Sequence, residues 1–200
     1  MRAVIFGGLG FIGVFFARHL IEVAGAKHVY LFDKQRLDDN NYEFRRRLLE
    51  KYPQITCIQG DVEDEICWDP EVGILDDFSD VQVIVHLAGE PIASPIRWDQ
   101  QKKNRIRRSR VRSTQSIVTQ LKEMDHQVHT FICASGIGIY PSSNHPMKED
   151  GPKGDRFLSQ VVSDWEAACD PIRESVRVLN ARFGTVLHPS GGVVKRLNPL

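Results

Sequence analysis

Short apolar runs alternate with amphipathic stretches along most of this 200-residue chain. The runs predict six strands, at Ala3 to Phe6, His28 to Phe32, Ile55 to Gln59, Val81 to Ala88, Thr130 to Ala134 and Val176 to Ala181. Most of them are unbroken, which is typical of strands buried on both faces. Because strand and helix patterns alternate, we expect an α/β fold with a doubly wound parallel sheet and right-handed crossovers.

The stretches between these runs predict helices. The first has apolar residues at helical spacing before Gly25 ends it, and its packing face would consist of Ile12, Phe16, Leu20 and Val23. Further helices are predicted at Asp39 to Tyr52, Arg105 to Met124 and Phe157 to Ser175, and Pro171 should break the last one near its end. The helix from Arg105 would pack through Val111, Thr114, Val118 and Leu121. Residues 141–155 are polar and predict a long loop.

A glycine cluster joins the first strand to the first helix. Gly7, Gly10 and Gly13 form the pattern GxxGxxG at this junction. Glycines there allow a tight turn, a close approach of the backbone to a ligand and close packing of helix on strand. A pyrophosphate can bind the free N–H groups at such a helix N-terminus, although glycines also serve plain chain reversal.

Asp33 favours the cofactor interpretation of these glycines. It lies twenty residues past Gly13, at the end of the second predicted strand, where a carboxylate accepts hydrogen bonds from the adenine-side ribose of a dinucleotide. No arginine is immediately beside it, and its charge opposes the 2′-phosphate of NADP. The sequence therefore predicts NAD rather than NADP, a preference that Lys34 and Arg36 would soften.

Composition argues against several classes of protein. Lys and Arg total 26, equal to Asp and Glu at 26, so net charge favours no particular partner. No window approaches the roughly 20 apolar residues of a membrane helix, and no secretory signal is recognisable, so we expect a cytoplasmic protein without membrane association. The cysteines have no CxxC spacing and predict buried, reduced thiols at Cys57, Cys67, Cys133 and Cys169. The histidines show no metal-ligand spacing, and His86 ends a buried strand, so no metal site is assigned.

A basic run raises the question of nucleic-acid binding. Seven basic residues lie between Lys102 and Arg112, after a segment from Asp61 to Asp80 that contains nine acids. Such runs occur in nucleic-acid sites. Here the basic residues fall on every face of the predicted helix and no aromatic residues interleave them, so we interpret them as a solvated helix surface and expect no nucleic-acid partner.

Several motifs carry a resemblance to a known family. GGLGFIG at residues 7–13, GDV at 60–62 and HLAG at 86–89 resemble the extended short-chain dehydrogenase/reductase superfamily, in its NAD-dependent epimerase/dehydratase branch. Longer segments resemble an epimerase-like subfamily of unknown substrate, namely WDPEVGILDD at 68–77, HLAGEPIASPIRW at 86–98, SRVRST at 109–114, CASGIGIY at 133–140, DRFLSQVVSDWEAA at 155–168 and ARFGTVL at 181–187.

The resemblance implies a dinucleotide site with four parts. The pyrophosphate loop would be Gly7, Gly10, Phe11, Ile12 and Gly13, and the ribose ligand Asp33, with Lys34 beside it. Asp61 and Val62 would lie near the adenine, and Leu87, Ala88 and Gly89 along the nucleotide. Other roles stay open, because Asp61 can start a turn and the small pair Ala88-Gly89 can let helices close over the sheet.

The superfamily's catalytic pattern is missing from its expected place. The resemblance implies a tyrosine and, four residues later, a lysine on a helix, whereas this chain has Phe157 and Val161 at those positions. Ser135 and Tyr140 match a serine and a second tyrosine of the subfamily and are the candidate catalytic residues. Alternatively, Ser135 satisfies local backbone groups and Tyr140 packs beside Pro141.

Two functions follow from this pattern, with a third as a simpler alternative. The first is an NAD-dependent epimerase/dehydratase-like oxidoreductase acting on a small-molecule substrate, with sugar nucleotides as the implied class. The second is a catalytically silent dinucleotide-binding sensor or regulatory module. The third is an interaction protein that uses the fold as a scaffold.

The resemblance also implies a domain organisation. Residues 1–187 would form a dinucleotide-binding Rossmann domain, and residues 188–200 would begin a substrate domain that is largely absent, or form a C-terminal tail. Without a domain that closes over the substrate, we expect dinucleotide binding with little turnover. The helix around residues 105–124 would form a homodimer face.

Overall fold

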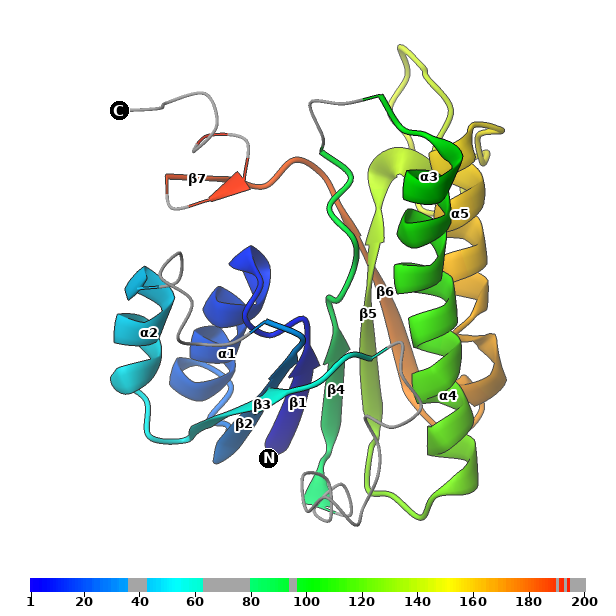
Figure 1. Ribbon diagram of the computed structural model, residues 1–200. Helices are drawn as coiled ribbons and strands as arrows, with labels where there is room; N and C mark the ends of the chain where they lie inside the picture. The colour runs from blue at the N-terminus through cyan, green and yellow to red at the C-terminus, as the bar shows by residue number, and fades with distance from the viewer. Residues whose placement is uncertain (36–42, 63–79, 94–96, 190, 193, 195–200) are drawn as a thin grey trace.

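The computed structural model describes residues 1–35, 43–62, 80–93, 97–189, 191, 192 and 194. The predicted doubly wound α/β fold is confirmed (Figure 1), with a six-stranded sheet in the order β3-β2-β1-β4-β5-β6. All neighbouring strands pair in parallel. The strands are β1 (Arg2–Phe6), β2 (His28–Asp33), β3 (Ile55–Gln59), β4 (Val83–His86), β5 (Thr130–Gly136) and β6 (Arg177–Phe183). The strand order reverses between β1 and β4, where such sheets bind ligands.

Helices cover both faces of the sheet. Figure 1 shows α1 (Phe11–Glu22) and α2 (Glu43–Glu50) on one face, and α3 (Gln100–Arg107), α4 (Ser113–Glu123) and α5 (Phe157–Ala167) on the other. A separate apolar core lies under each layer, one around Val14, Leu20 and Leu31, the other around Phe131 and Trp165. The predicted helix from Asp39 is described only from Glu43 onwards. No helix in the described ranges has the length and hydrophobicity needed to cross a membrane.

Helix α1 buries only part of the predicted face, since Leu20 is buried as predicted. Its buried residues are Gly13, Val14, Ala17 and Leu20, whereas the predicted Val23 is 70% exposed and Ile12 and Phe16 are only partly buried. Small residues bring the helix against the glycine loop, because a Cβ on Gly13 would lie 2.5 Å from the carbonyl oxygen of Gly8. The predicted end of the helix is confirmed at Gly25, which has φ +66° and follows the last turn.

The predicted helix Arg105 to Met124 begins earlier than expected. It starts as α3 at Gln100, because Asp99 caps it by accepting a hydrogen bond from the Lys102 N–H at 2.6 Å. A π-helical segment, Arg108–Arg112, then joins α3 to α4. Thr114, Val118 and Leu121 are buried in α4 as predicted, and Ile117 joins them, but Val111 is only partly buried.

The remaining differences are at element ends and among the cysteines. Helix α5 ends at Ala167, and Pro171 lies in a 3₁₀ turn, Asp170–Ile172. Residues 141–155 form the predicted irregular loop, and a short strand that was not predicted, β7 (Leu187–His188), bridges Gly191 and Gly192. Cys133 and Cys169 are buried as predicted, whereas the prediction for Cys57 is wrong, since it is exposed on the edge strand β3. Cys67 lies outside the described residues.

Candidate functional site

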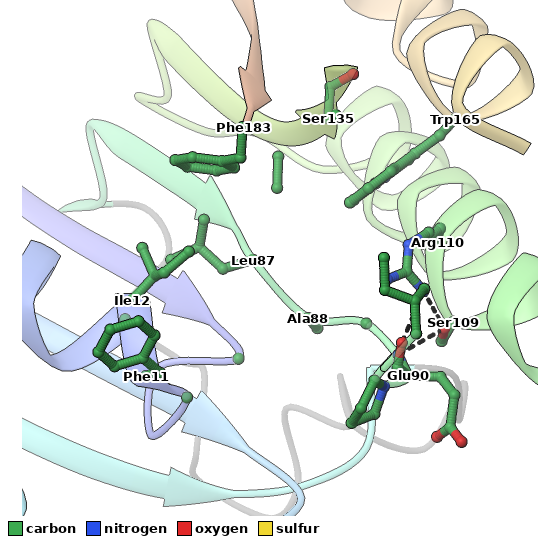
Figure 2. A pocket seen from close by; sticks show the side chains of 18 of the residues that line it. Phe11, Ile12, Leu87, Ala88, Glu90, Ser109, Arg110, Ser135, Trp165 and Phe183 are labelled. Carbon is green, nitrogen blue, oxygen red and sulfur yellow. Dashed lines mark hydrogen bonds between the residues drawn. The ribbon is translucent and has the colours of Figure 1, made fainter. Parts of the chain in front are cut away.

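A cleft of about 740 Å³ lies at the carboxyl ends of the strands. The glycine loop and the segment that follows β4 form part of its wall, together with β5, α5 and the π-helical segment (Figure 2). The structure brings to this one cleft every residue that the sequence predicted for the cofactor, namely Gly7, Gly10, Phe11, Ile12, Gly13, Asp33, Lys34, Asp61, Val62, Leu87, Ala88 and Gly89. Ser135 also lines the cleft, whereas Tyr140 is not among the lining residues.

The glycine loop is fixed between the ends of two strands. The N–H groups of Gly7 and Gly8 both donate to the carbonyl oxygen of Phe32, at 2.8 and 3.2 Å. Gly7 has φ +75°, and a Cβ there would lie 2.7 Å from the backbone nitrogen of Ala88. Only glycine fits this position, because both the backbone angle and the available space exclude a side chain.

The loop delivers the N-terminus of α1 to the cleft. Gly10 is the N-cap residue and offers no side-chain hydrogen bond, and the first turn contains no acidic residue. The first N–H groups of a helix have no partner within the helix and carry a partial positive charge. A phosphate or pyrophosphate is the kind of group that this end of α1 can hold.

Asp33 lies at the end of β2, beside the loop. Its carboxylate oxygens accept hydrogen bonds from the Leu9 N–H and the Gln35 N–H, both at 3.1 Å, so the side chain is oriented by the backbone on each side. Lys34 is exposed next to it, and Arg36 lies outside the described residues. This places a carboxylate within the predicted ribose region of the cleft.

The two candidate catalytic hydroxyls are both engaged within the protein. The Ser135 Oγ donates to the Glu166 Oε1 at 2.5 Å, and the Tyr140 hydroxyl accepts from the Arg182 Nη1 at 2.7 Å. Arg182 and Glu166 form an ion pair at 2.7 Å, so the four side chains make one cluster. Burial raises the pKa of Glu166, but hydrogen bonds from Arg182 and Ser135 outweigh it and leave that pKa below its usual value. The structure therefore joins both residues to a partly buried ion pair.

Helix α5 presents an apolar surface to the cleft. Its lining residues are Leu158, Val161, Val162 and Trp165, and none of them transfers protons near neutral pH. Val161 is fully buried, at the position where the superfamily pattern implies a lysine. The two acids of α5 are both paired, Asp164 with Arg107 and Glu166 with Arg182.

Sequence reasoning missed three residues of this region. Arg110 lines the cleft, although it lay within the basic run that we interpreted as solvated. Glu166 and Arg182 hold the Ser135 region together. The available signals were the glutamate in the predicted helix segment DWEAA and the arginine in the predicted strand segment ARF. Charged residues in segments that pack against a core are usually paired.

Comparisons with known proteins identify the family. The family model described as "KR domain" matches residues 2–145. The chain belongs to this family. Together with the relatives and solved structures described next, this match confirms the resemblance to the short-chain dehydrogenase/reductase superfamily, in its epimerase/dehydratase branch, and the Rossmann fold.

Relatives of this KR-domain chain include several described as epimerase family proteins. One from Mycobacterium bovis is 38% identical over 141 residues, covering 68% of this chain and 46% of the relative. SDR39U1 of Mus musculus is 33% identical over 118 residues, covering 58% of this chain and 40% of the relative. The chain thus spans about half the length of the curated relatives it matches.

Solved structures show the same architecture. Human epimerase family protein SDR39U1, solved with NADPH, superposes with a TM-score of 0.72 at 26% identity, covering 98% of this chain and 58% of that chain. UDP-glucuronic acid 4-epimerase from Bacillus cereus, solved with NAD, has a TM-score of 0.72 at 18% identity, covering 96% and 60%. The second likeness establishes the fold alone.

Proposed function

We propose that this chain binds a nicotinamide dinucleotide in the cleft and forms part of an epimerase/dehydratase-like oxidoreductase. One observation carries the proposal, namely that a single cleft gathers the uncapped N-terminus of α1, a loop whose Gly7 has no room for a side chain, and the carboxylate of Asp33. These features suit a pyrophosphate and a ribose. The presence of NADPH in the related human SDR39U1 structure supports the same cofactor class.

The cofactor would supply hydride chemistry, and the residues of this chain would hold it. The N-terminus of α1 binds the pyrophosphate, Asp33 accepts from the ribose hydroxyls, and Leu87, Ala88 and Gly89 lie along the nucleotide. NAD is the preferred form, because the charge of Asp33 repels a 2′-phosphate. Ser135 and Tyr140 are proposed to act on the substrate side, together with the ion pair that fixes them.

A second candidate function is a dinucleotide sensor without catalysis. It is favoured by the apolar surface of α5 and by the hydrogen bonds that engage the hydroxyls of Ser135 and Tyr140. Both functions need the same cofactor site and differ in turnover. An interaction scaffold, by contrast, needs no dinucleotide.

Calorimetric titration with NAD, NADH, NADP and NADPH tests the proposal. Gly136→Val is the variant expected to weaken binding, because Gly136 lines the cleft. A Cβ there meets no atom closer than 3.8 Å, so the added side chain narrows the cleft without straining the backbone. Gly25→Asn is the control, because Gly25 is outside the lining, nothing lies within 4 Å of its Cβ position, and asparagine tolerates positive φ. We expect binding that Gly136→Val weakens and Gly25→Asn does not. Absence of binding by all four dinucleotides would overturn the proposal.

Assembly is proposed from the resemblance. A homodimer would form through the helix around residues 105–124, where a hollow of about 410 Å³ lies between α4 and α5, lined by Val111, Val118 and Ala168 among others. Light scattering of the protein and of Val111→Glu tests this: a dimer mass that falls to the monomer in the variant supports it, and a monomeric wild type contradicts it.

A further inference from the structure

The proposed cofactor residues leave one cation in the cleft unexplained. Arg110 lies in the π-helical segment Arg108–Arg112 and lines the cleft. Figure 2 shows it across the cleft from Phe11 and Ile12, with Ala88 between them. A Cβ on Gly7 would touch Ala88, and a Cβ on Gly89 would touch Arg110, so the segment after β4 separates the glycine loop from this guanidinium.

One nitrogen of Arg110 anchors the side chain. Its Nη1 donates to the carbonyl oxygens of Glu90 and Ile106, at 3.1 and 3.2 Å, and lies 3.4 Å from the Ser109 Oγ. Among the described residues, its Nε and Nη2 form no hydrogen bond. The edge of the guanidinium formed by these two nitrogens is the one that can hold a carboxylate or phosphate through two hydrogen bonds.

The charge of Arg110 has no acidic partner within the described part of the chain. Glu90 acts on it electrostatically, but the Glu90 Oε1 binds the Lys102 Nζ at 2.5 Å and lies 3.6 Å from the Arg105 Nε. Burial lowers the pKa of Arg110 to about 10, partly opposed by Glu90, so the side chain stays charged at neutral pH. A partly buried charge without a partner is unfavourable, and a bound anion would compensate it.

The surrounding backbone holds Arg110 in this position. The Thr114 hydroxyl donates to the carbonyl oxygen of Arg110 at 2.7 Å, and the Ser113 hydroxyl donates to that of Ser109 at 2.8 Å, around a π-helical turn of the kind that often occurs at functional sites. The guanidinium lies over Gly89, whose Cβ position is 3.2 Å from the Arg110 Cζ. The Trp165 ring centroid is 5.3 Å from the same carbon, on another side.

We propose that Arg110 binds an anionic group of the substrate, a carboxylate or a phosphate, at the side of the cleft remote from the glycine loop. The inference deepens the proposed function and rests on it, since the anion belongs to a substrate only if the chain serves an oxidoreductase. The Trp165 ring, which also lines the cleft and is buried, lies beside the guanidinium and would limit the access of water to this ion pair. Substrates with a negative group at one end, rather than neutral ones, are the class that this cleft accepts.

Nuclear magnetic resonance of the Trp165 indole N–H provides the test. Inorganic phosphate and, separately, acetate are titrated into ¹⁵N-labelled protein in chloride-free buffer, with and without saturating NADH, and the signal is assigned with Trp165→Phe. We expect a saturable shift of the Trp165 signal with at least one anion, and the anion that binds identifies the group. The titration without NADH keeps the test independent of cofactor binding.

Charge variants decide whether Arg110 is responsible. Arg110→Gln should weaken anion binding by about tenfold or more while leaving NADH affinity within about twofold of the wild type. Arg110→Lys keeps the charge without the planar edge, so its anion affinity should lie between those of the wild type and Arg110→Gln. This variant tests the proposal even if Arg110→Gln does not fold. Arg107→Gln is the control, since Arg107 pairs with Asp164 outside the cleft at 2.6 Å, and it should bind the anion like the wild type.

Two results would overturn the proposal. One is a Trp165 signal that neither anion shifts, or that shifts equally in Arg110→Gln and the wild type. The other is a loss of NADH affinity in Arg110→Gln of tenfold or more, which would assign Arg110 to the cofactor. Failure of the proposed function shows differently, as absence of dinucleotide binding in every variant.

Discussion

His86 is a buried imidazole whose protonation state follows from its contacts. It is fully buried at the end of β4, with ring contacts to Phe6 and Trp165. Its Nε2 lies 3.0 Å from the Ser113 Oγ, and the Ser113 hydroxyl donates to the carbonyl oxygen of Ser109, so the imidazole is the donor of this pair. Its Nδ1 has no partner among the described residues, which is the arrangement of a neutral ring.

This neutral state predicts a loss of stability in acid. Burial, with a smaller contribution from Arg110, lowers the pKa of His86 to about 3. Below the unfolded value of about 6.5 the unfolded chain takes up a proton that the folded chain does not, so stability is lost as the pH falls from about 6.5 towards 3. Between pH 7 and pH 5 the wild type should lose about 2 kcal/mol more than His86→Leu in urea unfolding. Parallel pH dependences of the two proteins would contradict this.

Asp33 predicts the choice between the two dinucleotides. Asp33→Asn keeps an oxygen that can accept from the Leu9 N–H but removes the charge that opposes a 2′-phosphate. We expect the variant to shift the ratio of NADP to NAD affinity by about tenfold towards NADP. Asp61→Asn is the control, since Asp61 also lines the cleft but is predicted near the adenine, and its ratio should match the wild type. Calorimetry measures both ratios, and equal or tighter binding of NADP by the wild type would show the ribose assignment to be wrong.

At the scale of elements, strands were easier to predict than helix ends. The run VIVH of β4 has all four residues buried, so the apolar pattern alone identifies it. The start of α3 depended on one cap, Asp99, and the π-helical segment on side-chain hydrogen bonds from Ser113 and Thr114 to preceding carbonyls. Periodicity carries neither of these local signals. The face of α1 was partly missed because Gly13 and Ala17 are buried in it while contributing little hydrophobicity.

The junction of the π-helical segment and α4 depends on one buried hydroxyl. The Thr114 Oγ1 donates to the carbonyl oxygen of Arg110 at 2.7 Å and accepts from the Trp165 Nε1 at 2.9 Å. Thr114→Val keeps the shape and leaves that indole N–H buried without a partner, which should cost about 1–3 kcal/mol. Thr119→Val, at an exposed position of the same helix, should change stability by less than about 0.5 kcal/mol. Urea unfolding compares them, and equal effects would show that the hydroxyl does not support this junction.

For the whole molecule, the sequence predicted the cofactor side of the cleft better than the substrate side. The cofactor residues lie in short segments directly after β1, β2, β3 and β4, and parallel topology brings these segments to one edge. The environment of Ser135 depends instead on Glu166 and Arg182, which are 31 and 47 positions away along the chain and meet only through the packing of α5 against β5 and β6. Local patterns carry no information about such an ion pair.

The whole chain is predicted to bind a dinucleotide yet turn over little by itself. A dinucleotide at about 100 times its Kd should stabilise the fold by about 2.7 kcal/mol and raise the Tm by about 5–10 °C, and Gly136→Val should reduce this shift. Turnover should stay low, because a positioned proton donor contributes about 10² to 10⁴ in rate and the residues of α5 that line the cleft carry none. The measurements are thermal unfolding with each cofactor, and NADH formation or epimerisation across nucleotide sugars and small hydroxy compounds, with the mass in solution determined in parallel. Turnover by the monomer at about 10 s⁻¹, typical of enzymes, would contradict the prediction and assign the chemistry to Ser135 and Tyr140.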